Sequence, residues 1–351
     1  MLAYYLHNLD PIIVRLGPIT PRWYGLAYLL GFLCAYVLLK KLARGGILRL
    51  PLEKVPDLVL ACCIFGVLVG GRLGHCLFYD PHLFTDVSSA FPYWGVLRVN
   101  EGGMSAHGGV IGVILTLFYF AYKHRVSPLN LGDAACMVVP IGLFFGRLAN
   151  FVNGELYGHP STVPWAVKFP TELAYPYPHD RALTSEQVNA LIDQASALHP
   201  ELLKVDNPIQ RIIGYVQQND PGITTLVYDA LPARHPSQLY EALLEGVVLF
   251  MICWVIGRYW RKPGMAASAF LIGYPIFRIF CEHFRVGDAP PPALDFGPSL
   301  GVLYSLPMLL LGIVYLAAAL RAPRWPEKLG FKSAPEGSVV TEPPASVAEK
   351  K

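Results

Sequence analysis

Six ionisable side chains lie inside stretches of the sequence that are otherwise apolar. They are Arg72, Arg147, Glu241, Glu245, Arg278 and Glu282. A charge inside a membrane span costs about 2.5–3.5 kcal/mol on insertion scales, so such residues are usually kept for a function. A guanidinium group can bind two phosphate oxygens at once, and surroundings of low dielectric constant strengthen this contact. The three arginines therefore predict a phosphate-bearing ligand. The alternative is that the charges pair and hold helices together, as Arg278 and Glu282 can do at i,i+4.

A second group of polar residues surrounds Arg147, in the segment 146–158. Arg147, Asn150 and Asn153 recur every third residue and therefore share one face of a helix. Carboxamides on this face can hydrogen-bond the ester or glycerol oxygens of a lipid. Small residues and polar contacts between helices would explain the glycines of this segment. They do not explain a row of one arginine and two asparagines.

A third candidate is His107, which lies in the glycine-rich segment GGMSAHGG, residues 102–109. Glycines on both sides allow the backbone to approach a ligand or a neighbouring helix closely. A histidine near the start of a helix commonly makes a structural hydrogen bond. With an ordinary pKa of about 6.5, it is also the natural general base near neutral pH. Both roles remain open for His107.

The sequence gives no reason to expect a metal, a cofactor or a nucleic acid. All seven cysteines lie inside apolar stretches, and no CxxC pair occurs. We interpret these thiols as small apolar packing groups rather than as a disulfide framework or a zinc site. The net charge of +3 is too small to indicate binding to nucleic acid.

The residues that carry this chemistry are spread over apolar runs long enough to cross a bilayer, which takes about 20 residues. Seven runs qualify: 23–43, 57–79, 106–122, 133–153, 238–257, 265–284 and 300–320. Hydrophobic residues make up 54% of the chain and charged residues only 15%, as in a membrane protein. We therefore expect an all-α fold, a polytopic membrane bundle with seven transmembrane helices.

Basic residues are concentrated in the linkers that follow the first, third, fifth and seventh runs. In the short linkers 80–105 and 285–299, the only lysine or arginine is Arg98 and Arg285, respectively. The positive-inside rule then predicts a periplasmic N-terminus and a cytoplasmic C-terminus. In that orientation the three arginines lie toward the outer ends of their spans, so separate helices bring them to the depth of the outer leaflet.

The long linker between the fourth and fifth runs is expected to form a small periplasmic head. Thr184 and Gln187 make a capping box ahead of an apolar stripe, which predicts a helix there. The stripe consists of Val188, Leu191, Ile192, Ala195 and Leu198. The expected units are a periplasmic N-terminal segment (1–22), a membrane domain (23–321) that includes the periplasmic head (154–237), and a disordered cytoplasmic tail (322–351).

Five segments of the sequence resemble the prolipoprotein diacylglyceryl transferase family. The segment 146–158 resembles the family's signature, and the other matches follow in the family's order. These are Trp23–Gly25, Gly102–Gly109, Arg234–Glu241 and Tyr274–Glu282. The resemblance covers residues 20 to about 315. Ala149 stands where the family pattern has glycine and Ala106 where it has an aromatic residue, but no polar site residue is lost.

The resemblance implies a multi-pass enzyme of the bacterial inner membrane, with its active site toward the periplasmic leaflet. Such an enzyme moves diacylglyceryl from phosphatidylglycerol to the lipobox cysteine of a preprolipoprotein signal peptide, leaving a thioether and releasing glycerol phosphate. Its partners are these two substrates and the membrane lipid around it. It requires no cofactor and no metal.

The family's functional positions carry over to Tyr24, Arg72, His107, Arg147, Asn150, Glu155, Gly158, Tyr274, Arg278 and Glu282. A thiol has a pKa of about 8.5 and must lose its proton to attack carbon. His107 is the expected base, with Tyr24 or Tyr274 as a relay, while Arg147 and Arg278 hold the phosphodiester. The residues expected to bind phosphatidylglycerol are Arg72, Arg147, Asn150, Asn153, Glu155, Gly158 and Glu282.

Three alternatives remain at this point. The substrate itself can deprotonate the thiol in place of His107. A phospholipid transporter or flippase would also need arginines within the membrane, although its site would be expected near the midplane. A seven-helix receptor would have the same number of spans but would not need this set of arginines.

Overall fold

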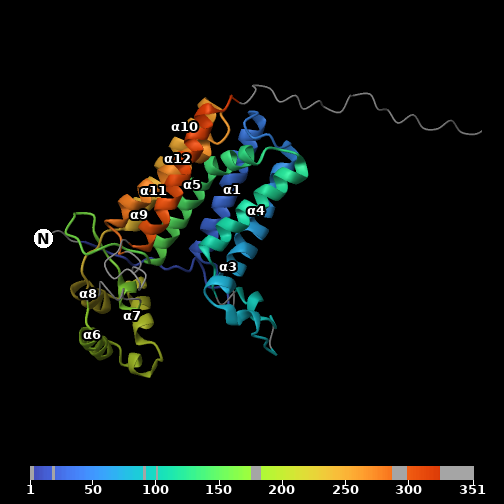
Figure 1. Ribbon diagram of the computed structural model, residues 1–351. Coiled ribbons are helices and arrows are strands. Elements are labelled where there is room, and N and C mark those ends of the chain that lie inside the picture. Colours follow the sequence, from blue (N-terminus) through green and yellow to red (C-terminus); the bar gives the residue numbers. More distant parts are fainter. Residues whose placement is uncertain are drawn as a thin grey trace, which may run out of the picture.

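Helices make up most of the chain in the computed structural model (Figure 1). The structure describes residues 4–17, 20–89, 92–99, 102–174, 183–286 and 299–324. Within these residues, the sheet consists of two short parallel strands, β1 (Tyr5–Leu6) and β2 (Val167–Lys168). Short 3-10 turns occur at Leu52–Lys54, Pro81–Phe84, Gly95–Leu97, Pro170–Leu173 and Pro200–Lys204. The expected helical fold is confirmed.

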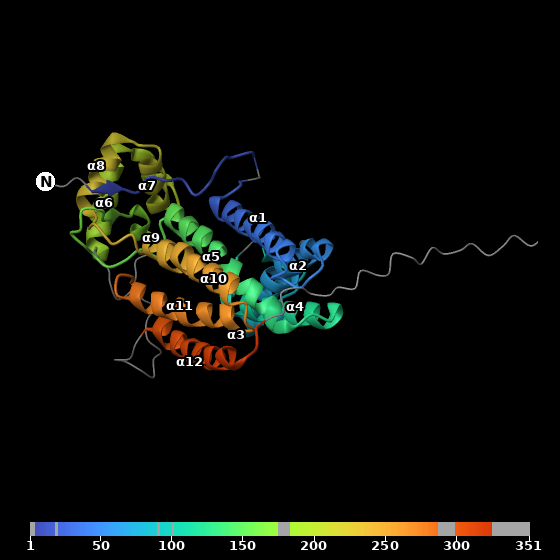
Figure 2. The same ribbon diagram turned by 90° about the horizontal axis from the view of Figure 1, so that it is seen from above.

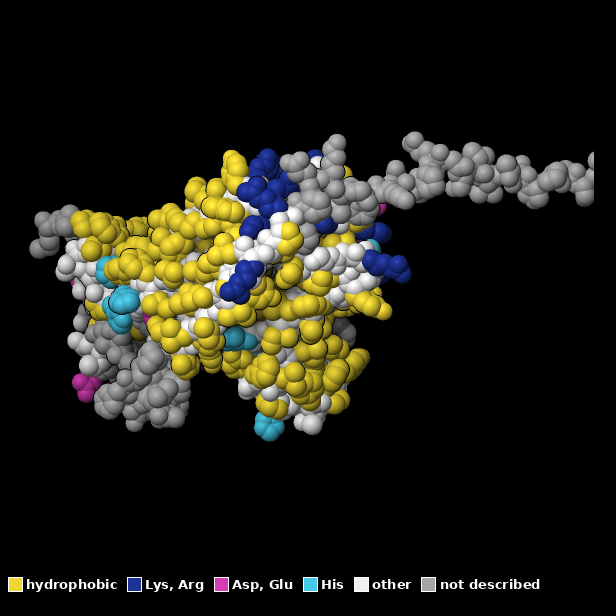
Figure 3. Space-filling model, turned by 45° about the horizontal axis from the view of Figure 1, so that its top comes forward, with side chains coloured by type: hydrophobic (Ala, Val, Ile, Leu, Met, Phe, Trp, Pro, Cys, Tyr) yellow, Lys and Arg dark blue, Asp and Glu magenta, His cyan; other side chains and the backbone are white. Residues whose placement is uncertain are grey.

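Among the residues that the structure describes, six helices are long and apolar enough to cross a membrane. They are α1 (Trp23–Arg44), α4 (Ala106–His124), α5 (Pro128–Asn153), a helix over Ser237–Trp260, α11 (Met265–Glu282) and α12 (Leu300–Arg321). The helix over Ser237–Trp260 consists of α9 (Ser237–Glu241), the π-helical segment η8 (Ala242–Val248) and α10 (Leu249–Trp260). Large apolar side chains face outward from the helices, and Leu115 and Leu310 are each 64% exposed. Figure 3 shows this hydrophobic surface as a broad area of the molecule, as expected of a multi-pass membrane protein.

The second predicted run corresponds to three consecutive helical segments. These are α2 (Val55–Ala61), the π-helical segment η2 (Cys62–Gly70) and α3 (Gly71–Phe78). The residues at both junctions keep right-handed helical dihedral angles, so the chain continues as a helix from one segment to the next.

Glycines let this second helical stretch approach α4 very closely. A Cβ atom added to Gly70 would lie 2.7 Å from the carbonyl oxygen of Gly108, and one added to Gly74 would lie 2.5 Å from the Cα of Gly108. Close contact between backbones through small residues is a common way to join helices in a membrane. Gly108, in the first turn of α4, therefore serves the approach to a neighbouring helix.

α5 occupies the centre of the bundle in both ribbon views (Figures 1 and 2). It packs against α1 on one side and against η8, α10 and α11 on the other, and α11 in turn packs against α12. An apolar core joins α5 to α1 and α4 near the ends of α1 and α4, with Leu42, Phe120, Leu131 and Met137 among its buried residues.

α6 (Ser185–Leu198), α7 (Pro208–Gln217) and α8 (Pro221–Ala230) form a small unit with a core of its own, here called the head. It lies near the point where α5 ends and α9 begins (Figure 1). The capping box predicted at Thr184 and Gln187 is present, and Leu191 and Ala195 of the predicted stripe are buried. Leu198, which belongs to the same stripe, is 53% exposed.

A histidine with two acidic partners joins the helices of the head. His199, at the end of α6, contacts Glu201 through Nδ1 at 3.0 Å and Asp220 through Nε2 at 3.1 Å, and its ring stacks on Tyr215. Glu201 and Asp220 accept hydrogen bonds from His199, and these bonds raise the pKa of His199 above its ordinary value. The imidazole therefore joins the end of α6 to Tyr215 of α7 and to Asp220 at the start of α8.

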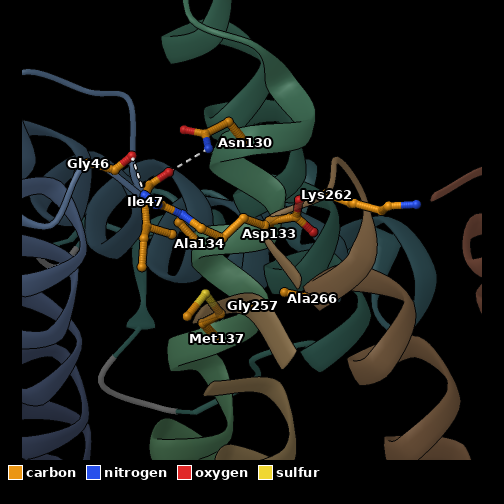
Figure 4. A pocket seen from close by; sticks show the side chains of 10 residues that line it. Gly46, Ile47, Asn130, Asp133, Ala134, Met137, Gly257, Lys262 and Ala266 are labelled. Atoms are coloured by element: carbon orange, nitrogen blue, oxygen red, sulfur yellow. Dashed lines mark hydrogen bonds between the residues drawn. The ribbon is translucent and has the colours of Figure 1, made fainter. Parts of the chain in front are cut away.

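Polar side chains of α5 fix the loops at the opposite end of the bundle. Asn130 donates to the carbonyl of Ile47 at 2.7 Å (Figure 4). It also accepts from the backbone N–H of Arg49 at 2.7 Å. Asp133 accepts the backbone N–H groups of Gly264 and Ala267 at the start of α11. These contacts fix the relative height of α5 and α11, which matters because both helices supply residues to the site described below.

Candidate functional site

Three arginines meet at one buried carboxylate. Glu241, at the end of α9, is fully buried and contacts Arg278 at 2.6 Å, Arg147 at 3.2 Å and Arg285 at 3.4 Å. Arg147 belongs to α5, Arg278 to α11, and Arg285 follows the end of α11. Arg147 and Arg278, which come from separate helices, thus lie within reach of one small ligand.

Two further glutamates complete this group. Glu245 is fully buried and accepts from Arg147 at 3.0 Å through Oε2. Glu282 lies 3.0 Å from Arg278 and accepts a hydrogen bond of 2.6 Å from the hydroxyl of Ser299. We refer to Arg147, Glu241, Glu245, Arg278, Glu282 and Arg285 as the arginine–glutamate cluster. It contains three positive and three negative groups, so it holds the helices together and also concentrates guanidinium groups in one place.

A close approach between α5 and η8 brings Arg147 to Glu245. A Cβ atom added to Gly246 would lie 2.7 Å from the Cβ of Phe144 and 2.9 Å from its Cα. Glu245 precedes this glycine, and Arg147 follows Phe144 by almost one helical turn. The absence of a side chain at Gly246 therefore sets the distance between the two charged residues.

The polar face of α5 continues beyond Arg147 to Glu155. Gly154 ends the helix in the left-handed conformation, with φ of 66°, and the chain turns back there. Asn150 and Asn153 donate to Glu155 Oε1 at 2.7 Å and 3.2 Å. The residues predicted on one helix face therefore lie together, and their carboxamides bind a carboxylate.

Gly158 is a point where three chain segments meet. Its N–H donates to the carbonyl of His235 at 2.8 Å, and its carbonyl accepts from Arg234 at 3.2 Å. A Cβ atom at Gly158 would clash with the carbonyl oxygen of Phe284, so this position has no room for a larger residue. Gly158 thus packs the segment after α5 against the end of α11. Burial and the nearby His159 lower the pKa of His235.

The hydrogen bonds of Arg72 within the described residues go to a loop and not to the arginine–glutamate cluster. It is 6% exposed and donates to four carbonyl oxygens of the loop before α4. The acceptors are Gly95 at 2.7 Å, Val96 at 2.8 Å, Gly102 at 2.7 Å and Gly103 at 3.0 Å. Arg72 therefore fixes the loop that leads to His107, and its contact with a lipid phosphate stays a prediction.

His107 is connected to the cluster through α12. The imidazole is exposed at the second residue of α4, and its ring packs edge-on against Tyr304, with centroids 5.2 Å apart. Gly301, three residues before Tyr304, is so close to the cluster that a Cβ atom there would lie 2.9 Å from Arg278 Nη2. The first turn of α12 thus lies between His107 and Arg278.

Tyr274 and Tyr24 both lie close enough to charged residues of the site to interact with them electrostatically, and Arg147 acts on both. Tyr274 is on α11, four residues before Arg278, and is influenced by Glu245, Arg147 and Arg278. Tyr24, at the start of α1, is influenced by Glu155 and Arg147. Within the described residues, no group of three or more His, Cys, Asp or Glu side chains could hold a metal ion.

Comparison with known proteins identifies the family. A model of the family described as prolipoprotein diacylglyceryl transferase matches residues 11–318. The chain belongs to this family. Among relatives named phosphatidylglycerol–prolipoprotein diacylglyceryl transferase, that of Bdellovibrio bacteriovorus is 37% identical over 342 residues, covering 91% of this chain and 97% of the relative. That of Serratia proteamaculans is 39% identical (89% of this chain, 93% of the relative) and that of Azospirillum brasilense 38% (92% and 99%).

This member of the prolipoprotein diacylglyceryl transferase family has two buried arginines that the sequence analysis left without a role. Arg234 is fully buried and pairs with Glu172 at 2.5 Å and 2.7 Å. Arg285 contacts Glu241 and was considered only as a loop charge. Arg285 lies beyond the end of α11, so the helical spacing of Arg278 and Glu282 does not extend to it and gave no signal for its contact with Glu241.

Proposed function

We propose that this chain transfers the diacylglyceryl group of phosphatidylglycerol to the lipobox cysteine of a preprolipoprotein, forming a thioether and releasing glycerol phosphate. The observation that carries the proposal is the meeting of Arg147 and Arg278 at Glu241 within an apolar helical bundle of this family. The transporter alternative finds no support, because the matching relatives are named as transferases.

The reaction replaces one bond to carbon by another. The bond between the glyceryl carbon and the phosphate oxygen breaks, and its electron pair leaves with the phosphate of glycerol phosphate. The thiolate sulfur forms the new bond to that carbon. Arg147 and Arg278 hold the phosphodiester and stabilise the charge that develops on the leaving oxygen.

The thiol proton passes to a base, for which we propose His107 with Tyr24 or Tyr274 as a relay. Deprotonation by the departing phosphate is the rival route. The residues proposed to hold the lipid are Arg72, Asn150, Asn153, Glu155, Gly158 and Glu282.

We further propose that the second helical stretch, 55–78, is a seventh span. Basic residues end α1, α4, α10 and α12, and Figure 3 shows lysines and arginines gathered at one end of the molecule. By the positive-inside rule this end is cytoplasmic, which places the N-terminus, the head and the arginine–glutamate cluster on the periplasmic side. The tail from residue 325 lies outside the described residues.

The test uses the full chain in detergent with labelled phosphatidylglycerol and a peptide that contains a lipobox cysteine. We expect a covalent lipopeptide with the unmodified chain and none with Arg147→Ala. Arg44→Ala, at the other end of the bundle, is the matched control. His107→Gln is compared with His82→Gln, an exposed loop histidine. Full activity of His107→Gln would exclude the histidine as base, and no lipopeptide from the unmodified chain would refute the transferase.

A further inference from the structure

The arginine–glutamate cluster is balanced in charge before any substrate is bound. Its three guanidinium groups face three carboxylates, and each of its side chains is at most 15% exposed. A phosphodiester adds one negative charge to this buried place. A buried charge without compensation is strongly unfavourable, so the cluster must change its own charge when the lipid binds.

The two fully buried glutamates differ in how firmly they are held. Glu241 contacts three arginines, so displacing it would take one carboxylate partner from each of them. Glu245 is bound to Arg147 alone, and both hydrogen bonds go to its Oε2 atom. Its Oε1 atom is buried and has no hydrogen-bond partner among the described residues; the Oε2 atom of Glu241 also lacks a hydrogen bond but lies 3.2 Å from Arg147 Nη1. Of these two glutamates, Glu245 is therefore the one whose displacement breaks fewer contacts and costs less free energy.

We infer that Glu245 is an exchangeable counter-ion of Arg147: the lipid phosphate takes its place on the guanidinium, and the displaced carboxylate takes up one proton. This inference rests on the proposed function, which supplies the phosphodiester. The charge of the site is then the same before and after binding. When glycerol phosphate leaves, Glu245 returns to Arg147 and releases the proton, so a complete cycle leaves the cluster unchanged.

The groups that face Glu245 agree with this exchange. Arg147 reaches it from α5, Glu241 precedes it by one turn, and Arg278 and Tyr274 act on it from α11. Once the phosphate occupies Arg147, Glu245 faces a second carboxylate in a buried place. A neutral, protonated carboxyl group is the stable form there. It can also donate a hydrogen bond to a phosphate oxygen.

Proton uptake on binding is the direct test. The full chain is placed in nanodiscs of phosphatidylcholine and titrated with dioctanoyl phosphatidylglycerol at pH 7, by calorimetry in two buffers of different ionisation enthalpy. The phosphodiester itself does not titrate near this pH. We expect uptake of about one proton per bound lipid for the unmodified chain and for Glu245→Asp, and none for Glu245→Gln. Glu186→Gln, on the exposed side of the head, is the matched control and should behave as the unmodified chain.

Transfer kinetics separate exchange from positioning. If Glu245 competes with the phosphate, Glu245→Gln should lower KM for phosphatidylglycerol by about tenfold, the factor that corresponds to 1.4 kcal/mol. Glu241→Gln should instead raise KM, because three arginines lose a carboxylate that fixes their positions. Binding without proton uptake by the unmodified chain, or a raised KM for Glu245→Gln, overturns the exchange. A chain that forms no lipopeptide fails as a transferase, whereas lipopeptide formed without proton uptake refutes the exchange alone.

Discussion

Replacing Gly246 by alanine tests how the helices position Arg147. The new methyl group would lie 2.7 Å from the Cβ of Phe144 and 2.9 Å from its Cα, well inside ordinary van der Waals contact. Because the Cα cannot rotate away, α5 and η8 must separate, by roughly half an ångström or more. Overpacking of this kind costs about 1–3 kcal/mol. The same shift moves Arg147 from Glu245, and a misplacement of about 1 Å in an active site can lower activity about 100-fold.

Thermal unfolding of the purified variant and its rate of lipopeptide formation measure the two effects. Gly132→Ala, also on α5, is the control, because no atom lies within 4 Å of the added methyl group. For Gly257→Ala the three nearest atoms all belong to the side chain of Met137, which is flexible, so its effect should be smaller. If Gly246→Ala were as stable and as active as Gly132→Ala, the contact between α5 and η8 would not be what holds Arg147 in place.

Three further predictions concern charges outside the cluster. Glu172→Gln removes the negative charge that pairs with the buried Arg234 and should lower stability by about 3–5 kcal/mol, measured by denaturant unfolding; Glu172→Asp should cost less. Burial lowers the pKa of His7 to about 4. The unfolded chain alone then takes up a proton between pH 6.5 and 4, so stability is full above pH 6.5 and falls by about 1.4 kcal/mol per pH unit below it. His7→Gln should flatten this slope; an unchanged slope would contradict the assignment. For His199 the sign is opposite. Its raised pKa stabilises the head below pH 6.5, and the contribution is lost as the pH rises through the folded-state pKa. The protection of backbone amides in α6–α8, taken as the intrinsic exchange rate relative to the observed rate at each pH, should therefore fall as the pH rises, and His199→Gln should remove that fall.

The neutral state of His7 also has a structural consequence. Its Nε2–H donates a hydrogen bond of 2.7 Å to the carbonyl of Phe151, and Phe151 is one of the last residues of α5. Through this bond His7, directly after β1, connects the N-terminal segment to the end of α5, the helix that carries Arg147. Nothing in the local sequence around His7 indicates this partner, which lies 144 positions away.

The sequence by itself determined the helices, because their signals are local. Six of the seven apolar runs became helices long enough to span a membrane, and the helix of the head begins at the predicted capping box. The shared face of Arg147, Asn150 and Asn153 follows from the helical period alone. Family membership also followed from the motifs, since they depend only on the order of residues in the chain.

Only the tertiary structure decided which partner each charged group has. Arg72 and Arg147 are both arginines within apolar runs, yet one binds four loop carbonyls and the other binds two glutamates. Arg285 looked like a loop charge and contacts Glu241 instead. The physical reason is that a helix of given sequence can be rotated about its axis and shifted along it, and each arrangement gives its charged residues different partners. Packing between helices, such as the approach of Gly246 to Phe144, selects one of them.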